Sequence, residues 1–313
     1  ADLQGDYFHL IIAPPQLAET GPVIKPKFAV LPNTGQVSSI RHADGLGYVH
    51  LHLCSGPTDS GHYHQDKGSF IMEVDGEELA IDRGVTSYDH PEVSLIGMAA
   101  RHNLLFPENP SGSAYQQPGH AAGGYLSSAI EQNSMILLAC DNAQAWEPGL
   151  FQTNIRRIFS PIPDLFFIDD QVELAEPMTM SFRLNSRCPI EARQGEVWVR
   201  GSKASLRIVP LNWQQAETHI AVEGIDCHLK PVNLLRLVTG TARQHRLLTA
   251  IQVVPNLPGP EQLWNLQGQT LITATKGDSI ITLVIQDTGL IVTAGDGNGQ
   301  SLKGTCSGAE WHI

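Results

Sequence analysis

The sequence FIMEVDGEELAID, residues 70–82, predicts a β-hairpin and points to the fold class of the whole chain. Asp75-Gly76 is a dipeptide that favours the type I′ turn, which joins two antiparallel strands directly. Before this turn, Phe70, Met72 and Val74 take every second position, as on one face of a strand, and residues 77–82 follow it as the second strand. Closing the hairpin pairs Met72 with Leu79 and carries Asp82 to its open end.

The same period-two alternation recurs along most of the chain. Val49, Leu51 and Leu53 fall on one face of a strand, because successive side chains of a strand point to opposite sides. Further strand candidates are residues 178–184, 197–199, 206–209, and the pair 271–275 and 280–285, which predicts a second hairpin. Few windows show helical spacing. We therefore expect an all-β chain: a large antiparallel β-sandwich of two-layer sheets with a small terminal β unit.

Proline and glycine divide the chain. The segment 255–260 contains three prolines and predicts a boundary between a sandwich domain, residues 1–256, and a small C-terminal β subdomain, residues 257–313. Residues 107–124 are rich in Pro, Gly, Ser and Gln without periodicity, which predicts a long loop of the kind that often serves function.

Composition excludes several classes of protein. The formal net charge of −12 argues against binding to nucleic acid or to an anionic membrane surface. No apolar run reaches the roughly 18 residues of a membrane-spanning helix, and no basic start precedes an apolar core as in a signal peptide. The five cysteines are scattered and form no CxxC pair, so disulfides are neither required nor excluded. The chain opens at Ala1 without Met, as a processed or truncated product does.

Imidazoles and carboxylates gather around the hairpin. His62 and His64 are two residues apart on an expected extended backbone, so both side chains point to the same side. The hairpin register brings Asp82 near His64, and a further imidazole follows in Arg101-His102-Asn103. Convergent nitrogen and oxygen donors of this kind are what a divalent metal site needs.

Several interpretations of these histidines compete. A metallo-β-lactamase-like hydrolase has the motif HxHxDH, but Lys67 stands where the last histidine belongs, and the alternating helices of that fold are missing. A cupin needs a glutamate three or four residues after the histidine pair, and the first one here is Glu73. His90 rivals His102 as a third ligand. The pair His50 and His52 is interpreted as an ordinary half-buried strand face without a carboxylate at helpful spacing.

One family carries the whole pattern. The motif HxHxDxxSF at residues 62–70, the hairpin ending in Asp-x-Gly at 82–84, Tyr88 and the His-Asn pair at 102–103 resemble the β domain of the heparinase II/III-like polysaccharide lyases. This superfamily includes heparin and heparan sulfate lyases and alginate or oligoalginate lyases. The segments 31–35, with Arg41, and 156–170 are similar to flanking parts, so that the resemblance covers roughly residues 28–256.

The resemblance implies a mechanism and a set of residues. These lyases cleave the bond to a 4-linked uronic acid by β-elimination. His62 is implied to assist proton removal or to neutralise the uronate carboxylate. His64, Asp82 and His102 are implied to bind one divalent ion, for which zinc is the first choice, and Asp66 to accept a hydrogen bond from a ligand imidazole. The residues expected to contact an acidic polysaccharide or oligosaccharide are Arg41, Lys67, Tyr88 and Arg101.

The chain departs from the family at one point. The tyrosine general acid of these lyases lies on an N-terminal (α/α) toroid, and this chain has no such helical region. We expect either the β portion of a longer enzyme, secreted or periplasmic in a bacterium, or a solitary β protein. The alternative function is a noncatalytic carbohydrate-binding or structural β-sandwich with a structural metal.

Overall fold

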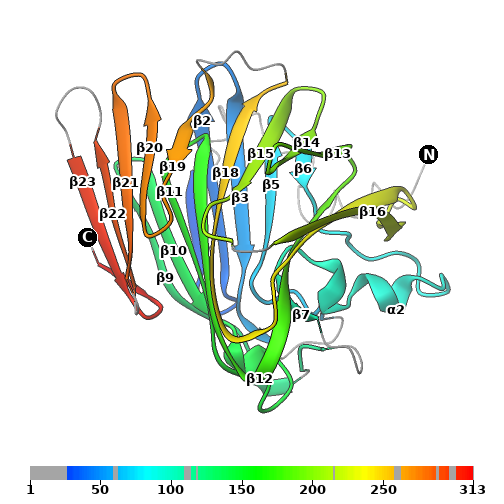
Figure 1. The fold of residues 1–313 in the computed structure, drawn as a ribbon. Helices are drawn as coiled ribbons and strands as arrows, with labels where there is room; N and C mark the ends of the chain where they lie inside the picture. The colour runs from blue at the N-terminus through cyan, green and yellow to red at the C-terminus, as the bar shows by residue number, and fades with distance from the viewer. Residues whose placement is uncertain are drawn as a thin grey trace, which may run out of the picture.

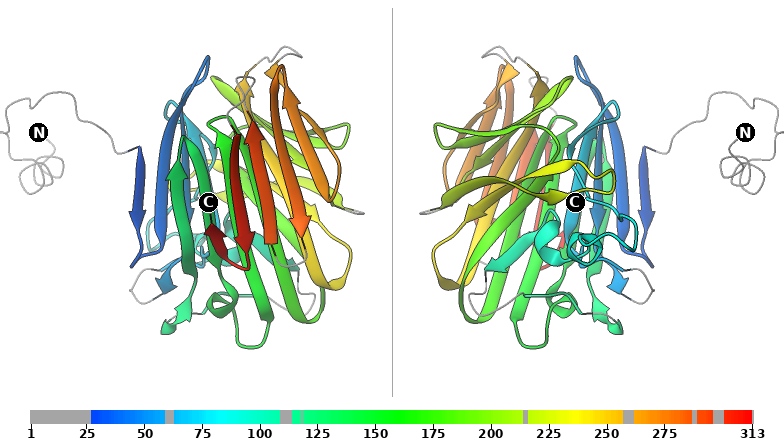
Figure 2. Two further views of the ribbon diagram at one scale, coloured as in Figure 1. Left: turned by 90° about the vertical axis from the view of Figure 1, so that its left-hand side faces the viewer. Right: turned by 90° about the vertical axis from the view of Figure 1, so that its right-hand side faces the viewer.

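A computed structural model describes residues 27–58, 63–108, 114–117, 119–213, 216–256, 262–286, 289–295 and 301–312. All strand pairs recorded in this part of the chain are antiparallel, and the strands form three large sheets and one small one. Figures 1 and 2 show these sheets stacked as layers. The all-β, antiparallel sandwich predicted from the sequence is therefore confirmed.

The first layer is a five-stranded sheet near the N-terminus. Its strands, in the spatial order of the sheet, are β1 (Phe28–Leu31), β2 (Gln36–Ala43), β3 (Gly47–Cys54), β5 (Ser69–Val74) and β6 (Glu77–Ala80). On β3, Val49, Leu51 and Leu53 are almost fully buried, so this predicted face is confirmed.

The predicted hairpin is present, but its register differs from the expected one. Asp75 and Gly76 both have positive φ, 46° and 77°, which is the signature of the type I′ turn. A β-bulge between Met72 and Glu73 shifts the ladder, so Met72 pairs with Ala80 and not with Leu79. The predicted pairing of Met72 with Leu79 is therefore wrong.

The central layer is an eleven-stranded sheet. Its main path runs through β13 (Ile190–Arg193), β14 (Glu196–Arg200), β15 (Ala204–Pro210), β18 (Ala242–Pro255), β12 (Leu165–Ser186), β11 (Phe151–Ile162), β10 (Met135–Asp141) and β9 (Tyr125–Gln132). The far half of β12 also pairs with β7 (Leu105–Glu108) and β17 (Pro231–Val238), and β17 pairs with β16 (Glu217–Ile225). The long strand β12 thus joins two parts of the sheet.

The third layer is a six-stranded sheet at the C-terminus. Its strands are β19 (Asn265–Gln267), β20 (Leu271–Lys276), β21 (Ser279–Gln286), β22 (Gly289–Gly295), β23 (Ser301–Ser307) and β24 (Glu310–His312). Lys276 pairs with Ser279 across a tight turn, so the second predicted hairpin is confirmed. This layer packs on the central sheet and shares a hydrophobic core with it, while the domain boundary at residue 256 stays a prediction.

The central sheet is buried on both faces. On β10, Ile136 and Leu138 face the core shared with the five-stranded sheet, whereas Leu137 and Ala139 face the C-terminal sheet. This is why residues 135–140 form a continuous apolar run instead of an alternating one. Trp146 belongs to the core shared with the five-stranded sheet, whereas Trp198 is buried beneath the Arg200 guanidinium, 4.1 Å from its ring centroid.

Short elements connect the layers. They are the two-stranded sheet of β4 (Pro57–Thr58) and β8 (Gly119–Gly123), the helix α2 (Val93–Ile96), and the 3-10 turns η1 (Ala99–Arg101) and η2 (Ala143–Ala145). Residues 107–124, predicted as one long loop, contribute the end of β7 and all of β8. The α2 region lies on the side of the sandwich away from the C-terminal sheet (Figures 1 and 2). None of the helices in the described residues is long and apolar enough to cross a bilayer.

Candidate metal centre

His64 lies on a short segment between β4 and β5 that is tied to its neighbours through the backbone. The Gln65 N–H donates to the Gly97 carbonyl at 2.8 Å, which attaches the segment to the end of α2. The Gly68 N–H donates to the Cys54 carbonyl at 2.7 Å, which attaches it to β3. These two bonds fix the backbone that follows His64. His62 lies outside the described residues.

Asp82 lies two residues after the end of β6. Its Oδ1 atom accepts a hydrogen bond from the Gly84 N–H at 2.7 Å, which forms a turn typical of aspartate. Gly84 has a φ of +69°, and a Cβ atom there would lie 2.9 Å from the Cys227 side chain, so glycine is required at this turn. The turn leaves Oδ2 of Asp82 facing His102.

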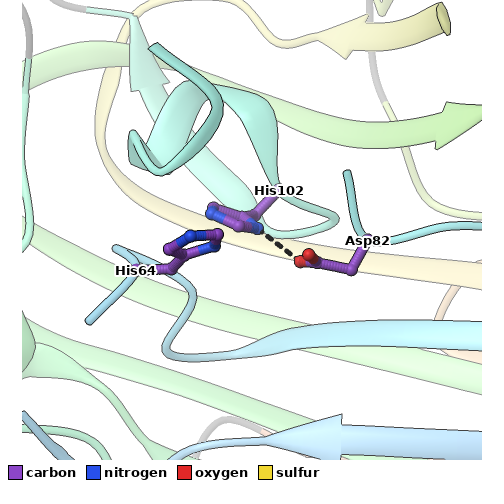
Figure 3. A group of neighbouring side chains, drawn as sticks. All are labelled: His64, Asp82 and His102. Atoms are coloured by element: carbon purple, nitrogen blue, oxygen red, sulfur yellow. Dashed lines mark hydrogen bonds and ion pairs between the residues drawn. The ribbon is translucent and has the colours of Figure 1, made fainter. Parts of the chain in front are cut away.

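His102 follows η1 and is fully buried. Its Nδ1 atom lies 2.8 Å from Oδ2 of Asp82, and its ring centroid lies 5.3 Å from that of His64. One donor atom from each of His64, Asp82 and His102 can be chosen so that all three lie within 4.8 Å of one another. Figure 3 shows the three side chains pointing toward one another from three separate segments.

The electrostatics of Asp82 and His64 suit metal ligands. Burial alone would raise the pKa of the Asp82 carboxyl, but the hydrogen bond and charge of His102 hold it well below its usual range. Burial, followed by the proximity of His102, lowers the pKa of His64. At neutral pH Asp82 is therefore ionised and His64 is neutral, and these are the protonation states that metal coordination needs.

The donor set fits a zinc-like ion. Two imidazole nitrogens and one carboxylate oxygen are common zinc ligands and leave a fourth tetrahedral position free. With metal–ligand bonds of about 2.0 Å, donors around a tetrahedral ion lie roughly 3.3 Å apart. Small side-chain rotations would bring donors within 4.8 Å to that spacing. Nδ1 of His102 and Oδ2 of Asp82 already lie 2.8 Å apart, close to this spacing.

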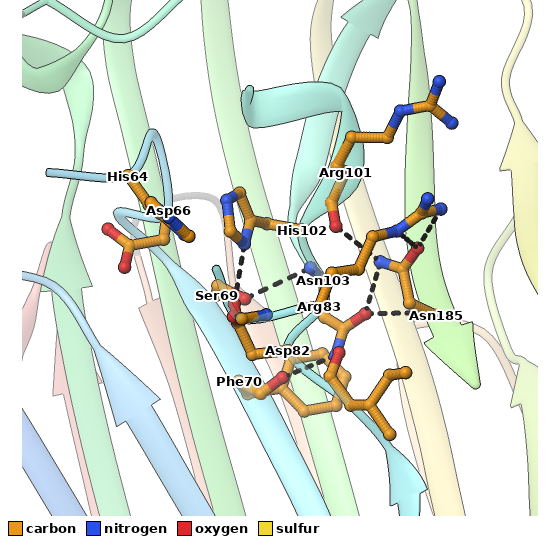
Figure 4. Close-up of polar contacts among 12 residues, drawn as sticks. His64, Asp66, Ser69, Phe70, Asp82, Arg83, Arg101, His102, Asn103 and Asn185 are labelled. Atoms are coloured by element: carbon orange, nitrogen blue, oxygen red, sulfur yellow. Dashed lines mark hydrogen bonds and ion pairs between the residues drawn. The ribbon is translucent and has the colours of Figure 1, made fainter. Parts of the chain in front are cut away.

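Asn103 connects the three segments that carry the triad. Its side-chain amide donates to the carbonyls of Phe70, at 2.7 Å, and Ile81, at 2.9 Å, next to Asp82. Its side-chain oxygen accepts from the backbone N–H and the side-chain amide of Asn185 on β12, at 2.7 and 2.9 Å. Figure 4 shows Asn103 at the centre of these contacts. Since Asn103 follows His102 directly, this clamp fixes the position of His102.

Arg156 on β11 of the central sheet contacts the segments that carry His64 and His102. Its guanidinium makes two hydrogen bonds, of 2.7 and 2.8 Å, to the carboxylate of Asp170, which is its partner in the β11–β12 register. Its Nη1 atom donates to the carbonyls of Gly68, at 2.7 Å, and Asn103, at 3.0 Å. The ion pair with Asp170 holds Arg156 in place, and the two carbonyl bonds of Arg156 link the His64 segment to the His102 segment.

A second arginine pair joins the centre to the β16–β17 hairpin. Arg83, next to Asp82, is fully buried and donates to the side-chain oxygen of Asn185 at 3.0 and 2.7 Å. Arg83 also donates to the Glu223 carbonyl, and Arg101, next to His102, donates to the Glu223 carboxylate. β16 is therefore attached to the residues that flank two members of the triad.

The remaining candidate residues differ in their surroundings. Asp66 pairs with the Lys67 ammonium, and in the described residues it shares no recorded hydrogen bond with a triad imidazole. Lys67 also donates to the His64 carbonyl at 3.5 Å, so both residues belong to the His64 segment. Tyr88 is 71% exposed on the stretch between Asp82 and α2, where it is accessible to a ligand.

Arg41 is separated from this group. It is buried and donates to the carbonyls of Ser134 and Ser160 at 2.7 and 3.2 Å, with its guanidinium 5.3 Å from the Phe166 ring centroid. Burial lowers its pKa to about 10. These contacts connect the first layer to the central sheet and give no support to the expected contact of Arg41 with a polysaccharide.

The rival histidines also lie elsewhere. His90 accepts a hydrogen bond from the Glu92 N–H at 3.1 Å and is not among the converging donors. His50 contacts Ser38 at 2.9 Å and the Glu73 carboxylate at 3.0 Å, so the statement that this pair lacks a nearby carboxylate is wrong. Register explains the contact, because His50 and Glu73 are directly opposite on β3 and β5.

Sequence reasoning missed the supporting residues Arg156, Asn185 and Glu223. One signal was available for Arg156. Two arginines interrupt the apolar run of β11, and two aspartates interrupt that of β12, so opposite charges face each other across the hairpin. Asn185 and Glu223 have no comparable signal, because their partners lie far away in the sequence.

A known protein family and several solved structures resemble this chain. The family model described as "Heparinase II/III-like, C-terminal" matches residues 25–228. The heparan sulfate lyase HepC from Pedobacter heparinus shares 13% identity with a TM-score of 0.66, over 99% of this chain and 48% of that chain. A heparinase III, the BT4657 gene product, shares 12% identity with a TM-score of 0.67, over 90% of this chain and 43% of that chain.

These structures are similar in fold, and the chain spans less than half of their length. No curated protein sequence matches it significantly. The family model covers well over half of the chain, including all three residues of the triad. The chain therefore belongs to the heparinase II/III-like C-terminal domain family.

Proposed function

We propose that this chain is the metal-binding β portion of a lyase that cleaves uronic-acid-containing acidic polysaccharides by β-elimination. The observation that carries the proposal is the convergence of His64, Asp82 and His102 in a chain of the heparinase II/III-like family. Structures similar to it in fold are described as a heparan sulfate lyase and a heparinase III, which supports this substrate class. The activity would belong to a longer protein that also contains an (α/α) toroid, exported to the periplasm or the cell exterior.

The triad would hold one divalent ion, with zinc as the first choice. Such an ion supplies positive charge beside the substrate when it is bound. Other residues of the chain position the three ligands. Asn103 and Arg156 hold the segments of His102 and His64 at fixed positions, so that the ligands need little reorganisation.

The elimination itself would proceed next to the triad. The C5 proton of the uronate leaves, a C4–C5 double bond forms, the C4–O bond breaks and the departing oxygen takes a proton. We assign to His62 either the removal of the C5 proton or the neutralisation of the uronate carboxylate. The tyrosine that protonates the leaving oxygen would come from the toroid. Lys67, Arg101 and Tyr88 are proposed to contact the acidic chain. Lys67 and Arg101 would do so through their positive charge, in exchange for their present carboxylate partners Asp66 and Glu223.

The experiment uses the longer protein and a panel of heparan sulfate, alginate and polygalacturonate. Unsaturated uronate products absorb in the ultraviolet, so activity is measured as a rise in absorbance. We expect His62→Ala to abolish this rise while the metal content, measured by elemental analysis, stays at one ion per chain. Full activity of His62→Ala on every substrate that the unmodified protein cleaves would refute the assignment of His62.

A noncatalytic β-sandwich with a structural metal is the second candidate. One observation favours it: the triad residues come from three different segments, so an ion bound there would cross-link them. In that case chelation lowers thermal stability, the longer protein cleaves no polysaccharide, and His62→Ala changes neither property. The same absorbance assay separates the two candidates.

A further inference from the structure

A second candidate binding site lies between the central sheet and the C-terminal sheet. A cleft of about 800 Å³ is lined there by β12, β18, the turn between β17 and β18, the turn before β20 and the end of β21. None of the residues of the metal centre described above contributes to its walls. The cleft is thus a separate feature, and nothing in the proposed lyase chemistry uses it.

The cleft exists because strand β12 leaves its neighbour at this point. Glu173 pairs with Gln244 of β18, but the next recorded pair is Met178 with Ala242. Four residues of β12 therefore stand opposite a single residue of β18, and the ladder opens. On the far side, the Ile285 N–H donates to the Thr270 carbonyl at 2.8 Å, which fixes the turn that forms the other wall.

The side chains of the lining are mostly polar and uncharged, beside the apolar Val172, Leu247 and Ile285. Its amide side chains are Gln171, Asn212, Gln244, Gln269 and Gln286, and its hydroxyl side chains are Thr153, Thr239, Thr241 and Thr270. The ionisable side chains are Glu173, His245 and Arg246. Amides and hydroxyls both donate and accept hydrogen bonds, so together they suit a ligand that is itself rich in hydroxyl groups.

The ionisable side chains of the cleft already make hydrogen bonds. The Arg246 guanidinium makes two hydrogen bonds, of 2.8 and 2.9 Å, to the buried carboxylate of Asp169. Glu173 accepts from the Gln244 amide at 3.2 Å. Nε2 of His245 lies 2.9 Å from the Met178 carbonyl, so this ring is held by the backbone. The cleft therefore presents little net charge to a ligand.

Part of the lining is rigid, and part is free to bind. Asn212 donates to the Arg246 carbonyl at 3.0 Å and accepts from the Leu248 N–H at 2.6 Å, so its amide is used by the fold. In the part of the chain that the structure describes, no hydrogen bond is recorded for the side chains of Thr241, Gln269 or Gln286, all of which are exposed. A firm floor with adaptable polar groups at the rim is a suitable arrangement for recognition.

This chemistry excludes most ligand classes. A polyanion needs unpaired cations, but the one arginine of the lining is bonded to Asp169, which it shares with Arg157, and its charge is offset within the lining by Glu173. A purely hydrophobic ligand would leave the amide and hydroxyl groups of the cleft without partners, and a metal ion needs more than its single carboxylate. We propose that the cleft binds a short, neutral, hydroxyl-rich segment of a carbohydrate chain, and that it does so independently of the metal centre.

The test measures binding of the chain to neutral oligosaccharides, with cellohexaose, xylohexaose and mannohexaose as probes and hexagalacturonate as the charged comparison. Titration calorimetry should give saturable binding of at least one neutral probe. Thr241→Trp places a large side chain in the cleft and should weaken this binding at least tenfold. Gln244→Ala should weaken it roughly threefold to tenfold, the value of one net hydrogen bond.

Two controls keep the outcome clear. Gln132→Ala removes an exposed glutamine outside the cleft, at the end of β9, and should leave binding unchanged. EDTA should also leave it unchanged, which separates this site from the metal centre and from the proposed function. The proposal is overturned if no neutral probe binds, if Thr241→Trp binds as well as the unmodified chain, or if only hexagalacturonate binds.

Discussion

The buried Arg156–Asp170 pair offers the sharpest test of how the metal centre is held. Both side chains are almost fully buried, at 2% and 4% exposure, and they are joined by two hydrogen bonds. Arg156→Leu removes the cation and leaves the Asp170 carboxylate buried without its partner. Breaking a buried pair in this way costs about 3–5 kcal/mol. This is a large share of the roughly 5–15 kcal/mol that stabilises a typical domain.

The same substitution also removes the donor that links Gly68 and Asn103. Zinc affinity should therefore fall together with stability, because the segments of His64 and His102 lose their common anchor. Adding Asp170→Asn to Arg156→Leu removes the orphaned charge, and should recover roughly half of the lost stability. It should not recover zinc affinity, since both carbonyls still lack the guanidinium.

The assay is urea unfolding followed by tryptophan fluorescence, with zinc affinity measured by competition against a chelating dye. The matched control is Arg243→Leu, because Arg243 is 52% exposed and lies 3.6 Å from an exposed glutamate. Surface pairs of this kind contribute little, so a change within about 0.5 kcal/mol is expected. If Arg156→Leu does not fold, Arg156→Lys keeps the charge but loses the bidentate geometry, and should cost about 2 kcal/mol. A loss below 1 kcal/mol for either variant would refute the reasoning.

Three further predictions concern the triad and the fold. Removing a bound metal with EDTA should lower the midpoint of thermal unfolding, and zinc should restore it, because an ion at 1,000 times its Kd adds about 4 kcal/mol to the free energy of unfolding. His102→Ala should show no such response, and a response equal to that of the unmodified protein would contradict the site. Gly97→Ala should weaken zinc binding several-fold, since a Cβ atom at this position lies 3.3 Å from Cδ2 of His64. The melting temperature of the metal-free protein should change by no more than about 2 °C. The control is Ser94→Ala, at an exposed position of α2, and equal zinc affinities of the two variants would contradict this contact. Partial burial would raise the pKa of Glu77, but hydrogen bonds from the turn between β14 and β15 lower it. The ionised Glu77 carboxylate therefore stabilises the fold above the unfolded pKa of about 4.3, and this stabilisation is lost as the pH falls through the lower folded pKa. Urea unfolding of Glu77→Gln should show a loss of about 1 kcal/mol at pH 7 that becomes small near pH 3, and an equal loss at both values would be the contrary result.

The strands and turns of this protein could be predicted from the sequence because they depend on local signals. Alternating apolar residues identify β3, and Asp75-Gly76 identifies the hairpin turn. The register of that hairpin could not be predicted, because a bulge at Met72 depends on packing against other strands. The burial of the central sheet on both faces was equally hidden, since it required knowing that the C-terminal strands cover one of them.

The amino-acid sequence by itself determined which side chains are present and how they are spaced, and this was sufficient to propose the ligands His64, Asp82 and His102. Only the tertiary structure decided that these three converge, that Arg41 is turned into the core, and that Arg156 supports the centre from another sheet. The physical reason is the range of the interactions. Periodicity and turn preference act over a few residues, whereas the burial of an arginine or the meeting of three ligands depends on contacts between segments far apart in the chain.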